Sequence, residues 1–203
     1  MLWRKSPLDI FRNETIAKTV SKHINEMQKF NLILILVLTF SCAQKQSDNR
    51  IAEFEKVLGE RQTKALNLLV SDFEKNLSKI YPNLTIEQGY NEYLTDLISN
   101  STTDWEKFKF QSDKTNAEFH KSGLWNEIYT KDSVSGLQVN GIGKYMQALY
   151  SVKDSDSLIK KYWKKREAAG MMQNELVIPG ILSLNPDFDN YFHKRIVVAE
   201  FSF

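Results

Sequence analysis

The sequence has few of the groups from which common catalytic and metal sites are built. Its 203 residues include one cysteine, Cys42, and only three histidines. A single cysteine excludes an intramolecular disulfide and leaves no second thiol for a metal site. Neither a Gly-x-Ser-x-Gly nor a His-Glu-x-x-His motif occurs, and only His120 and His193 follow Cys42. The sequence therefore predicts no cofactor and no metal, and it offers little choice of general base.

The sequence after residue 41 also has no excess of basic or of acidic residues. Residues 1–41 hold six of the 27 basic and three of the 25 acidic residues, so 21 basic and 22 acidic residues remain after them. A nearly neutral domain gives no electrostatic reason to expect nucleic acid as a partner. No repeat of fixed period, low-complexity tract or interdomain linker is visible, which favours a single domain.

The longest apolar run is too short to span a bilayer. Residues 30–40 are apolar except for Asn31 and Thr39. As a helix the run would cover about 16 Å, whereas a bilayer core is about 30 Å thick. A basic residue, Lys29, precedes the run and small residues follow it, which is typical of a signal-peptide core. The alternative is a buried core helix.

The end of this run resembles a known processing signal. Leu38-Thr39-Phe40-Ser41-Cys42 resembles the lipobox of bacterial lipoproteins, in a looser form similar to that of Bacteroidetes lipoproteins. Ser41 and Cys42 fit the pattern directly, whereas Leu38 lies one position early. The resemblance implies lipidation of Cys42, which would become the mature N-terminus and anchor the protein to a lipid bilayer. We then expect an envelope location, with the outer membrane favoured over the inner.

Four segments are expected along the chain. Residues 27–41 form the signal peptide, because Met27-Gln28-Lys29 makes an ordinary signal start, and residues 1–26 are then an upstream extension. The alternative for residues 1–26 is an amphipathic cytoplasmic arm before a short signal anchor. Residues 42–49 are a polar tether, and residues 50–203 are the folded domain.

The spacing of apolar residues after residue 50 predicts a mostly α fold, built as a single helical domain. A long helix is expected over residues 50–80, bent at Gly59. Thr85, with Gln88 three residues later, predicts a capping box for the next helix. Further helices are expected over 86–98, 104–110, 112–121, 142–152 and 157–169, with residues 131–143 as a loop.

The C-terminal residues 195–203 are ambiguous between strand and helix. Their β-branched run Ile196-Val197-Val198 favours a strand, whereas the recurrence of apolar residues there permits a helix. A strand would need Leu137–Val139 or Leu176–Ile178 as its partner. A short β element near the C-terminus is therefore left open.

A basic stretch over residues 158–166 is the first candidate for function. Its lysines are expected opposite an apolar arc on one helix; they are Lys160, Lys161, Lys164 and Lys165. Such a face could bind a membrane surface, and the alternative is an ordinary solvated face over a buried one. Arg166 falls within the apolar arc, so we expect it to find a carboxylate partner or to leave the arc through the last turn of the helix.

Two aspartates and a histidine form the second candidate. Asp189 and His193 are four residues apart and would share a helix face, with Asp187 close by. Carboxylates and an imidazole can bind a divalent metal or exchange protons. The alternative is that Asn185 caps this helix and Pro186 begins it. Helix initiation alone then explains most of the polar residues, without a catalytic or metal-binding role.

The turn Asn140-Gly141-Ile142-Gly143 is the third candidate. It precedes an expected helix and could bind an anion at the helix N-terminus. The alternative is a flexible loop that leads into the helix.

Taken together, these features favour a membrane-anchored envelope lipoprotein with a non-catalytic binding or assembly role, working with an envelope protein partner. An envelope hydrolase using Asp187, Asp189 and His193 is one alternative. A membrane-surface binder using the four lysines is the other. The sequence does not identify the ligand.

Overall fold

The chain folds mainly into α-helices, which confirms the predicted fold class. The computed structural model describes residues 49–99, 111–132 and 136–201, and the residues from Arg50 on belong to one unit. The predictions for Cys42, for residues 1–48 and for the 104–110 helix lie outside the described residues. No helix in these described ranges is both long and apolar enough to cross a membrane.

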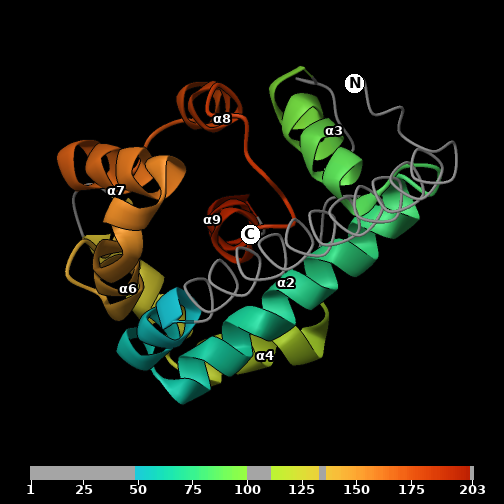
Figure 1. Cartoon of the computed structure of the whole chain (residues 1–203). Helices are drawn as coiled ribbons and strands as arrows, with labels where there is room; N and C mark the ends of the chain where they lie inside the picture. The colour runs from blue at the N-terminus through green and yellow to red at the C-terminus, as the bar shows by residue number, and fades with distance from the viewer. Residues whose placement is uncertain (1–48, 100–110, 133–135, 202–203) are drawn as a thin grey trace, which may run out of the picture. The chain divides into compact units, whose positions relative to one another are not determined.

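Figure 1 shows how the helices are arranged. Residues 50–58 are helical. The later α-helices are α2 (Glu60–Ile80), α3 (Ile86–Ser99), α4 (Asp113–Lys121), α5 (Leu124–Ile128), α6 (Lys144–Val152), α7 (Ser157–Ala169), α8 (Asn174–Leu182) and α9 (Tyr191–Phe201). A single 3₁₀ turn, η2 (Lys153–Ser155), joins α6 to α7.

Local signals in the sequence set several of these helix boundaries. Gly59 interrupts the first helix at the predicted bend, with a φ of 98° that favours glycine. The capping box before α3 is confirmed, because Gln88 N–H donates to Thr85 Oγ1 over 3.2 Å and Thr85 N–H donates to Gln88 Oε1 over 3.0 Å. Gly170, with a φ of 61°, is the C-cap of α7.

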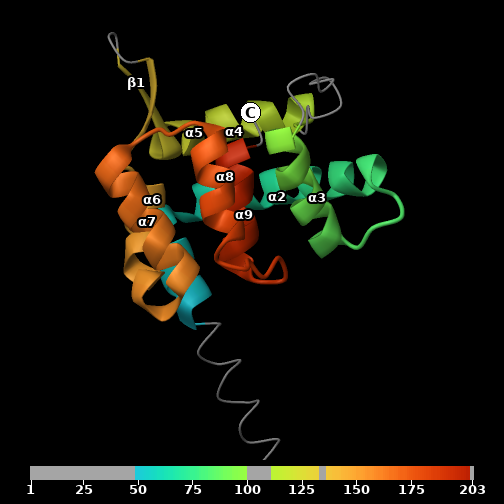
Figure 2. The same cartoon turned by 90° about the horizontal axis from the view of Figure 1, so that it is seen from above.

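The β structure is a hairpin in the middle of the chain. Strands β1 (Tyr129–Asp132) and β2 (Gly136–Val139) pair antiparallel, with Tyr129 opposite Val139. In Figure 2 the hairpin extends away from the helices. The prediction of a loop over residues 131–143 is therefore wrong for part of its length, because cross-strand pairing overrides the weak local pattern.

The residues that could be either strand or helix at the C-terminus are helical as far as Phe201. Residues 176–178, considered as a strand partner, lie in α8. The β-branched residues of α9 are compatible with a helix here because α9 is buried on nearly every side. Burial of this kind offsets the modest helix propensity of valine and isoleucine.

Helix α9 lies among the other helices, and Figure 1 shows it end-on with α2, α3, α7 and α8 around it. It contacts α2 and α7 directly. Phe54 adds the helix of residues 50–58 to this core, because its ring lies 5.6 Å from that of Phe192 and 6.3 Å from that of Tyr145. The buried residues of α9 are Phe192, His193, Arg195, Ile196, Val197, Val198, Ala199 and Phe201.

Three buried tyrosines satisfy backbone carbonyls of α9. The Tyr93 hydroxyl donates to the carbonyl of Phe201 over 2.6 Å, and the Tyr129 hydroxyl donates to that of Ala199. Tyr145 donates to the carbonyl of Arg195 over 3.3 Å. Burial raises the pKa of all three tyrosines, so the hydroxyls remain donors. These bonds join α3, β1 and α6 to the same helix.

Replacement of Tyr93 by phenylalanine should destabilise the protein, because the Phe201 carbonyl loses its buried donor. The expected loss is about 1–3 kcal/mol of unfolding free energy, measured by urea denaturation followed by circular dichroism. Tyr150→Phe is the matched control, since Tyr150 is 54% exposed, and it should change the value by less than about 0.5 kcal/mol. Equal effects of the two variants would contradict this account of Tyr93.

Candidate functional site

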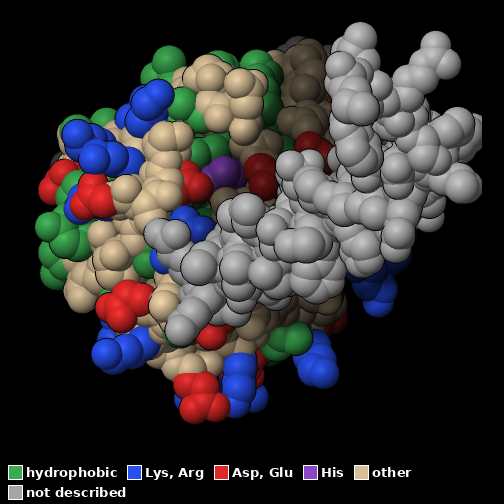
Figure 3. Space-filling view, viewed as in Figure 1, with side chains coloured by type: hydrophobic (Ala, Val, Ile, Leu, Met, Phe, Trp, Pro, Cys, Tyr) green, Lys and Arg blue, Asp and Glu red, His purple; other side chains and the backbone are tan. Residues whose placement is uncertain are grey.

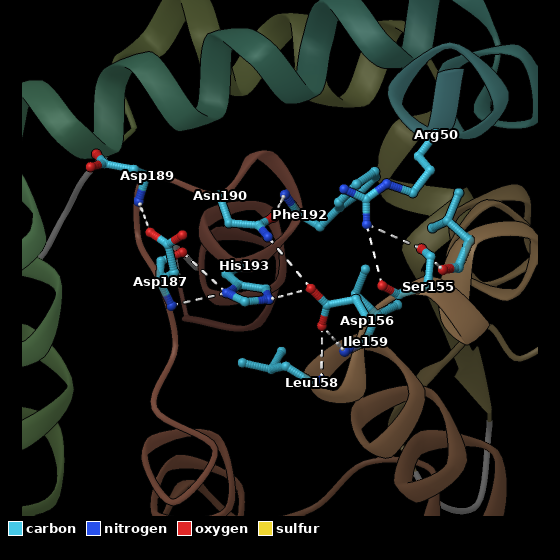
Figure 4. A network of polar contacts seen from close by, with 11 residues as sticks. Arg50, Ser155, Asp156, Leu158, Ile159, Asp187, Asp189, Asn190, Phe192 and His193 are labelled. Atoms are coloured by element: carbon cyan, nitrogen blue, oxygen red, sulfur yellow. Dashed lines mark hydrogen bonds and ion pairs between the residues drawn. The ribbon is translucent and has the colours of Figure 1, made fainter. Parts of the chain in front are cut away.

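The carboxylate of Asp156 joins the start of α7 to the start of α9. Its Oδ1 accepts hydrogen bonds from the N–H groups of Leu158 (2.8 Å) and Ile159 (3.2 Å), so Asp156 is the N-cap of α7. Its Oδ2 lies 3.0 Å from His193 Nε2 and accepts a weaker bond from Asn190 Nδ2 at 3.4 Å. Figure 4 shows the two oxygens of this carboxylate turned toward the two elements.

The second ring nitrogen of His193 is also held by the protein. His193 Nδ1 lies 3.0 Å from the N–H nitrogen of Asp187 and 3.1 Å from its carbonyl oxygen (Figure 4). A neutral imidazole accepts from that N–H, and a protonated one donates to that carbonyl. Both nitrogens therefore have internal partners in a residue that is only 7% exposed. A general base needs a nitrogen directed at its substrate, and this geometry instead makes His193 a structural link.

The predicted grouping of Asp187, Asp189 and His193 is only partly present. Helix α9 begins at Tyr191, so the prediction that Asn185 caps it and Pro186 begins it is wrong, and Asp189 does not share its face. The Asp187 carboxylate accepts from Asp189 N–H over 2.8 Å, and both aspartates are exposed. Asn190 takes the role assigned to Asn185, because its Oδ1 accepts from Phe192 N–H over 2.8 Å.

Sequence reasoning missed Asp156 as the partner of His193. The two residues are 37 positions apart, and only their tertiary arrangement brings them together. The position of Asp156 before Ser157 is a recognisable N-cap signal, but it does not indicate the histidine. Within the described ranges, three or more His, Cys, Asp or Glu residues are nowhere close enough together to hold a metal ion.

The prediction of a carboxylate partner for Arg166 is confirmed. Arg166 Nε donates to Glu200 Oε1 over 2.9 Å, a second guanidinium nitrogen contacts Glu200 Oε2, and Tyr162 also donates to this carboxylate. The remaining terminal nitrogen donates to the carbonyl of Gly170 over 2.8 Å. Arg166 is 3% exposed, and the pair is therefore buried with its hydrogen bonds satisfied.

The predicted anion-binding turn is occupied by a carboxylate of the protein itself. Glu127 Oε2 accepts from Lys144 N–H over 2.7 Å at the N-terminus of α6. A Cβ on Gly143 would lie 2.1 Å from the Glu127 carbonyl oxygen, so the backbone of the turn is pressed against α5. Asn140 fastens the turn further through its side-chain nitrogen, which donates to the Asn126 carbonyl over 2.7 Å.

A cavity of about 250 Å³ lies between α7 and α8. Its lining residues on α7 recur at positions i, i+3, i+4 and i+7, which places them on one face, and the others come from α8 and the segments at its two ends. Figure 3 shows Lys and Arg side chains beside hydrophobic ones over these two helices. The lining residues are Leu158, Lys161, Tyr162, Lys165, Met172, Val177, Gly180, Ile181, Ser183 and Leu184.

The four lysines of α7 differ in their position relative to this cavity. Lys161 and Lys165 line it, on the same face as Leu158 and Tyr162. Lys160 points elsewhere and forms an ion pair of 2.8 Å with Asp154. The structure thus places two of the predicted basic residues at an apolar pocket, which the sequence pattern of the basic stretch did not indicate.

Comparison of the chain with protein-family models, with curated proteins and with solved structures found no match.

Replacement of Asp156 by asparagine should destabilise the protein at neutral pH, and this loss should diminish as the pH falls through the folded pKa of Asp156. Burial raises the pKa of Asp156, but hydrogen bonds from His193 and from the Ile159 N–H outweigh it, so the pKa lies below its ordinary 3.8. A carboxyl with a lowered pKa stabilises the fold above pH 4 and loses that contribution as pH falls through the folded pKa. The expected loss at pH 7 is about 1–3 kcal/mol, measured by urea denaturation.

Asp156→Ala serves as the comparison, because alanine loses the capping oxygen as well as the charge. It should cost about 1 kcal/mol more than Asp156→Asn at pH 7. A loss in Asp156→Asn that does not decrease as acid protonates Asp156 in the unsubstituted protein would contradict the role given to the charge.

Proposed function

We propose that the protein is a lipid-anchored component of a bacterial envelope that binds a small apolar ligand between α7 and α8, without converting it chemically. The cavity of about 250 Å³, lined by apolar side chains from two helices, is the observation that carries this proposal. Ligand pockets in proteins are typically concave and mostly apolar, with a few polar groups that orient the ligand. The α7–α8 cavity has this composition.

The groups around the cavity support binding in preference to catalysis. The described lining residues include no carboxylate and no imidazole. Their hydroxyl groups have other partners, because Ser183 donates to the Gly180 carbonyl over 3.0 Å and Tyr162 donates to Glu200. Proton transfer to a bound molecule would need an acid or base within hydrogen-bonding reach. His193, the candidate base, has both ring nitrogens engaged elsewhere.

The membrane anchor rests on the signal-like residues 27–41 and on Cys42. Each buried methylene of an acyl chain contributes about 0.8 kcal/mol, so two or three chains on Cys42 would hold the protein on the bilayer. The outer membrane is favoured over the inner. A ligand pocket on a tethered domain suits a protein that collects or presents an apolar molecule near the bilayer, together with an envelope protein partner.

The two alternatives receive less support from the geometry. An envelope hydrolase would need Asp187, Asp189 and His193 to face one substrate. The His193 ring instead contacts the Asp187 backbone and Asp156, and the Asp187 carboxylate accepts from the Asp189 N–H. A membrane-surface binder would need Lys160, Lys161, Lys164 and Lys165 on one free face. Two of them line the cavity, and Lys160 is paired with Asp154.

The intact mass of the protein purified from its native membranes tests the anchor. We expect a mass that begins at Cys42 and includes acyl chains, and we expect Cys42→Ser to abolish this processing. An unprocessed mass that includes Met1 or Met27 would contradict the anchor, whatever the pocket binds.

Obstruction of the pocket tests the binding site. Leu184→Trp adds bulk at the lining, so it should weaken the binding of eight-carbon probes such as octan-1-ol or octanoate by about tenfold, a loss of about 1.4 kcal/mol. Leu176→Trp is the matched control, because Leu176 is 63% exposed on α8 and does not line the cavity. Unchanged affinity in Leu184→Trp would place the ligand elsewhere.

A further inference from the structure

We infer that the ligand of the α7–α8 cavity is a single-chain amphiphile with an anionic head group, and that Lys161 and Lys165 bind this head group. The inference rests on the proposed function, since it assigns a chemical class to the ligand of the same site. It is carried by the placement of the two lysines at the cavity and by the cavity's size.

The two lysines repel one another in the protein without ligand. Lys161 and Lys165 are four residues apart on α7, where like charges destabilise a helix. No carboxylate of the described residues lies within ion-pairing distance of either lysine, whereas Lys160 on the same helix is paired with Asp154 at 2.8 Å. An anion bound between the two ammonium groups would relieve this repulsion.

The Lys165 side chain lies along the cavity wall. A Cβ on Gly180 would be 2.7 Å from the Lys165 ammonium nitrogen, so this group lies over the backbone of α8. Lysines on a helix surface usually extend their ammonium group into water. The last turn of α8 offers one explanation, because carbonyl groups there attract a cation. That explanation applies to Lys165 and does not account for Lys161.

The apolar part of the cavity fits one short chain. A volume of 250 Å³ equals that of roughly eight water molecules at about 30 Å³ each, which corresponds to about eight to ten chain atoms. Met172 forms part of the lining, and its flexible thioether suits the irregular outline of an alkyl chain.

Three probes with the same eight-carbon chain separate head-group recognition from apolar binding. Octanoate, octan-1-ol and octylamine are titrated into the full-length lipidated protein in nanodiscs of neutral phosphatidylcholine, and empty nanodiscs correct for partition. The readout is the ¹³C-methyl signal of Met172, which lines the cavity and is assigned with a Met172→Leu variant. Octanoate should bind about tenfold more tightly than octan-1-ol, and octylamine should bind most weakly.

The lysine variants test which side chains bind the head group. Lys161→Gln and Lys165→Gln should each lower octanoate affinity about tenfold, to that of octan-1-ol, and Lys165→Arg should restore it. Lys164→Gln is the control, because Lys164 is exposed and does not line the cavity. If Lys165 only stabilised the end of α8, its variant would lower the urea midpoint and leave octanoate affinity unchanged, and this result would overturn its assignment.

The other outcomes separate the inference from the proposed function. Equal affinity for all three probes, unchanged in the glutamine variants, would overturn the anionic head group and leave the apolar pocket in place. Absence of any shift of the Met172 signal up to the solubility limit of the probes would overturn both.

Discussion

The buried ion pair between Arg166 and Glu200 is the interaction on which the arrangement of α7 depends. Its charges are satisfied by each other, by Tyr162 and by the Gly170 carbonyl. Loss of one member of such a pair leaves an uncompensated buried charge and costs about 3–5 kcal/mol. The pair therefore specifies one alignment of α7 on α9, because any shift along the helices would separate the charges. It also explains why a helix as apolar as α9 carries a glutamate among its last described residues.

A second link, between Asp156 and His193, fixes the N-terminal end of α7. These two links hold α7 to α9 at the N-terminal cap of α7 and near its C-terminus. The face of α7 that carries Leu158 and Lys165 is therefore directed toward α8. Helix α8 packs on α3 and belongs to a different side of the core. The cavity exists because two helices fixed independently of each other leave apolar faces that do not close completely. Polar contacts inside the core thus help to determine the position of the pocket, and Tyr162 belongs to both.

Local features were predictable from the sequence, and the long-range contacts were not. The capping box at Thr85 is specified by residues three apart, and a lone arginine within an apolar arc already requires a carboxylate. The identity of that carboxylate, and the pairing of Asp156 with His193, depend on helices distant in the chain. The start of α9 was misplaced because Asn185 and Asn190 carry the same capping signal, and only packing selects between them.

The contacts at the base of the β-hairpin make it a self-contained insertion between α5 and α6. Glu127 holds the first turn of α6, and the Asn140 N–H donates to the Ile128 carbonyl over 2.8 Å, so the chain leaves and re-enters the helical body at nearly the same point. Because these contacts and the buried Tyr129 close the base, the length of the excursion beyond them is free to vary. Replacement of residues 131–137 by a foreign peptide or a short turn would therefore leave the helical body unaltered, which makes this position a natural place for an epitope or a fluorescent label.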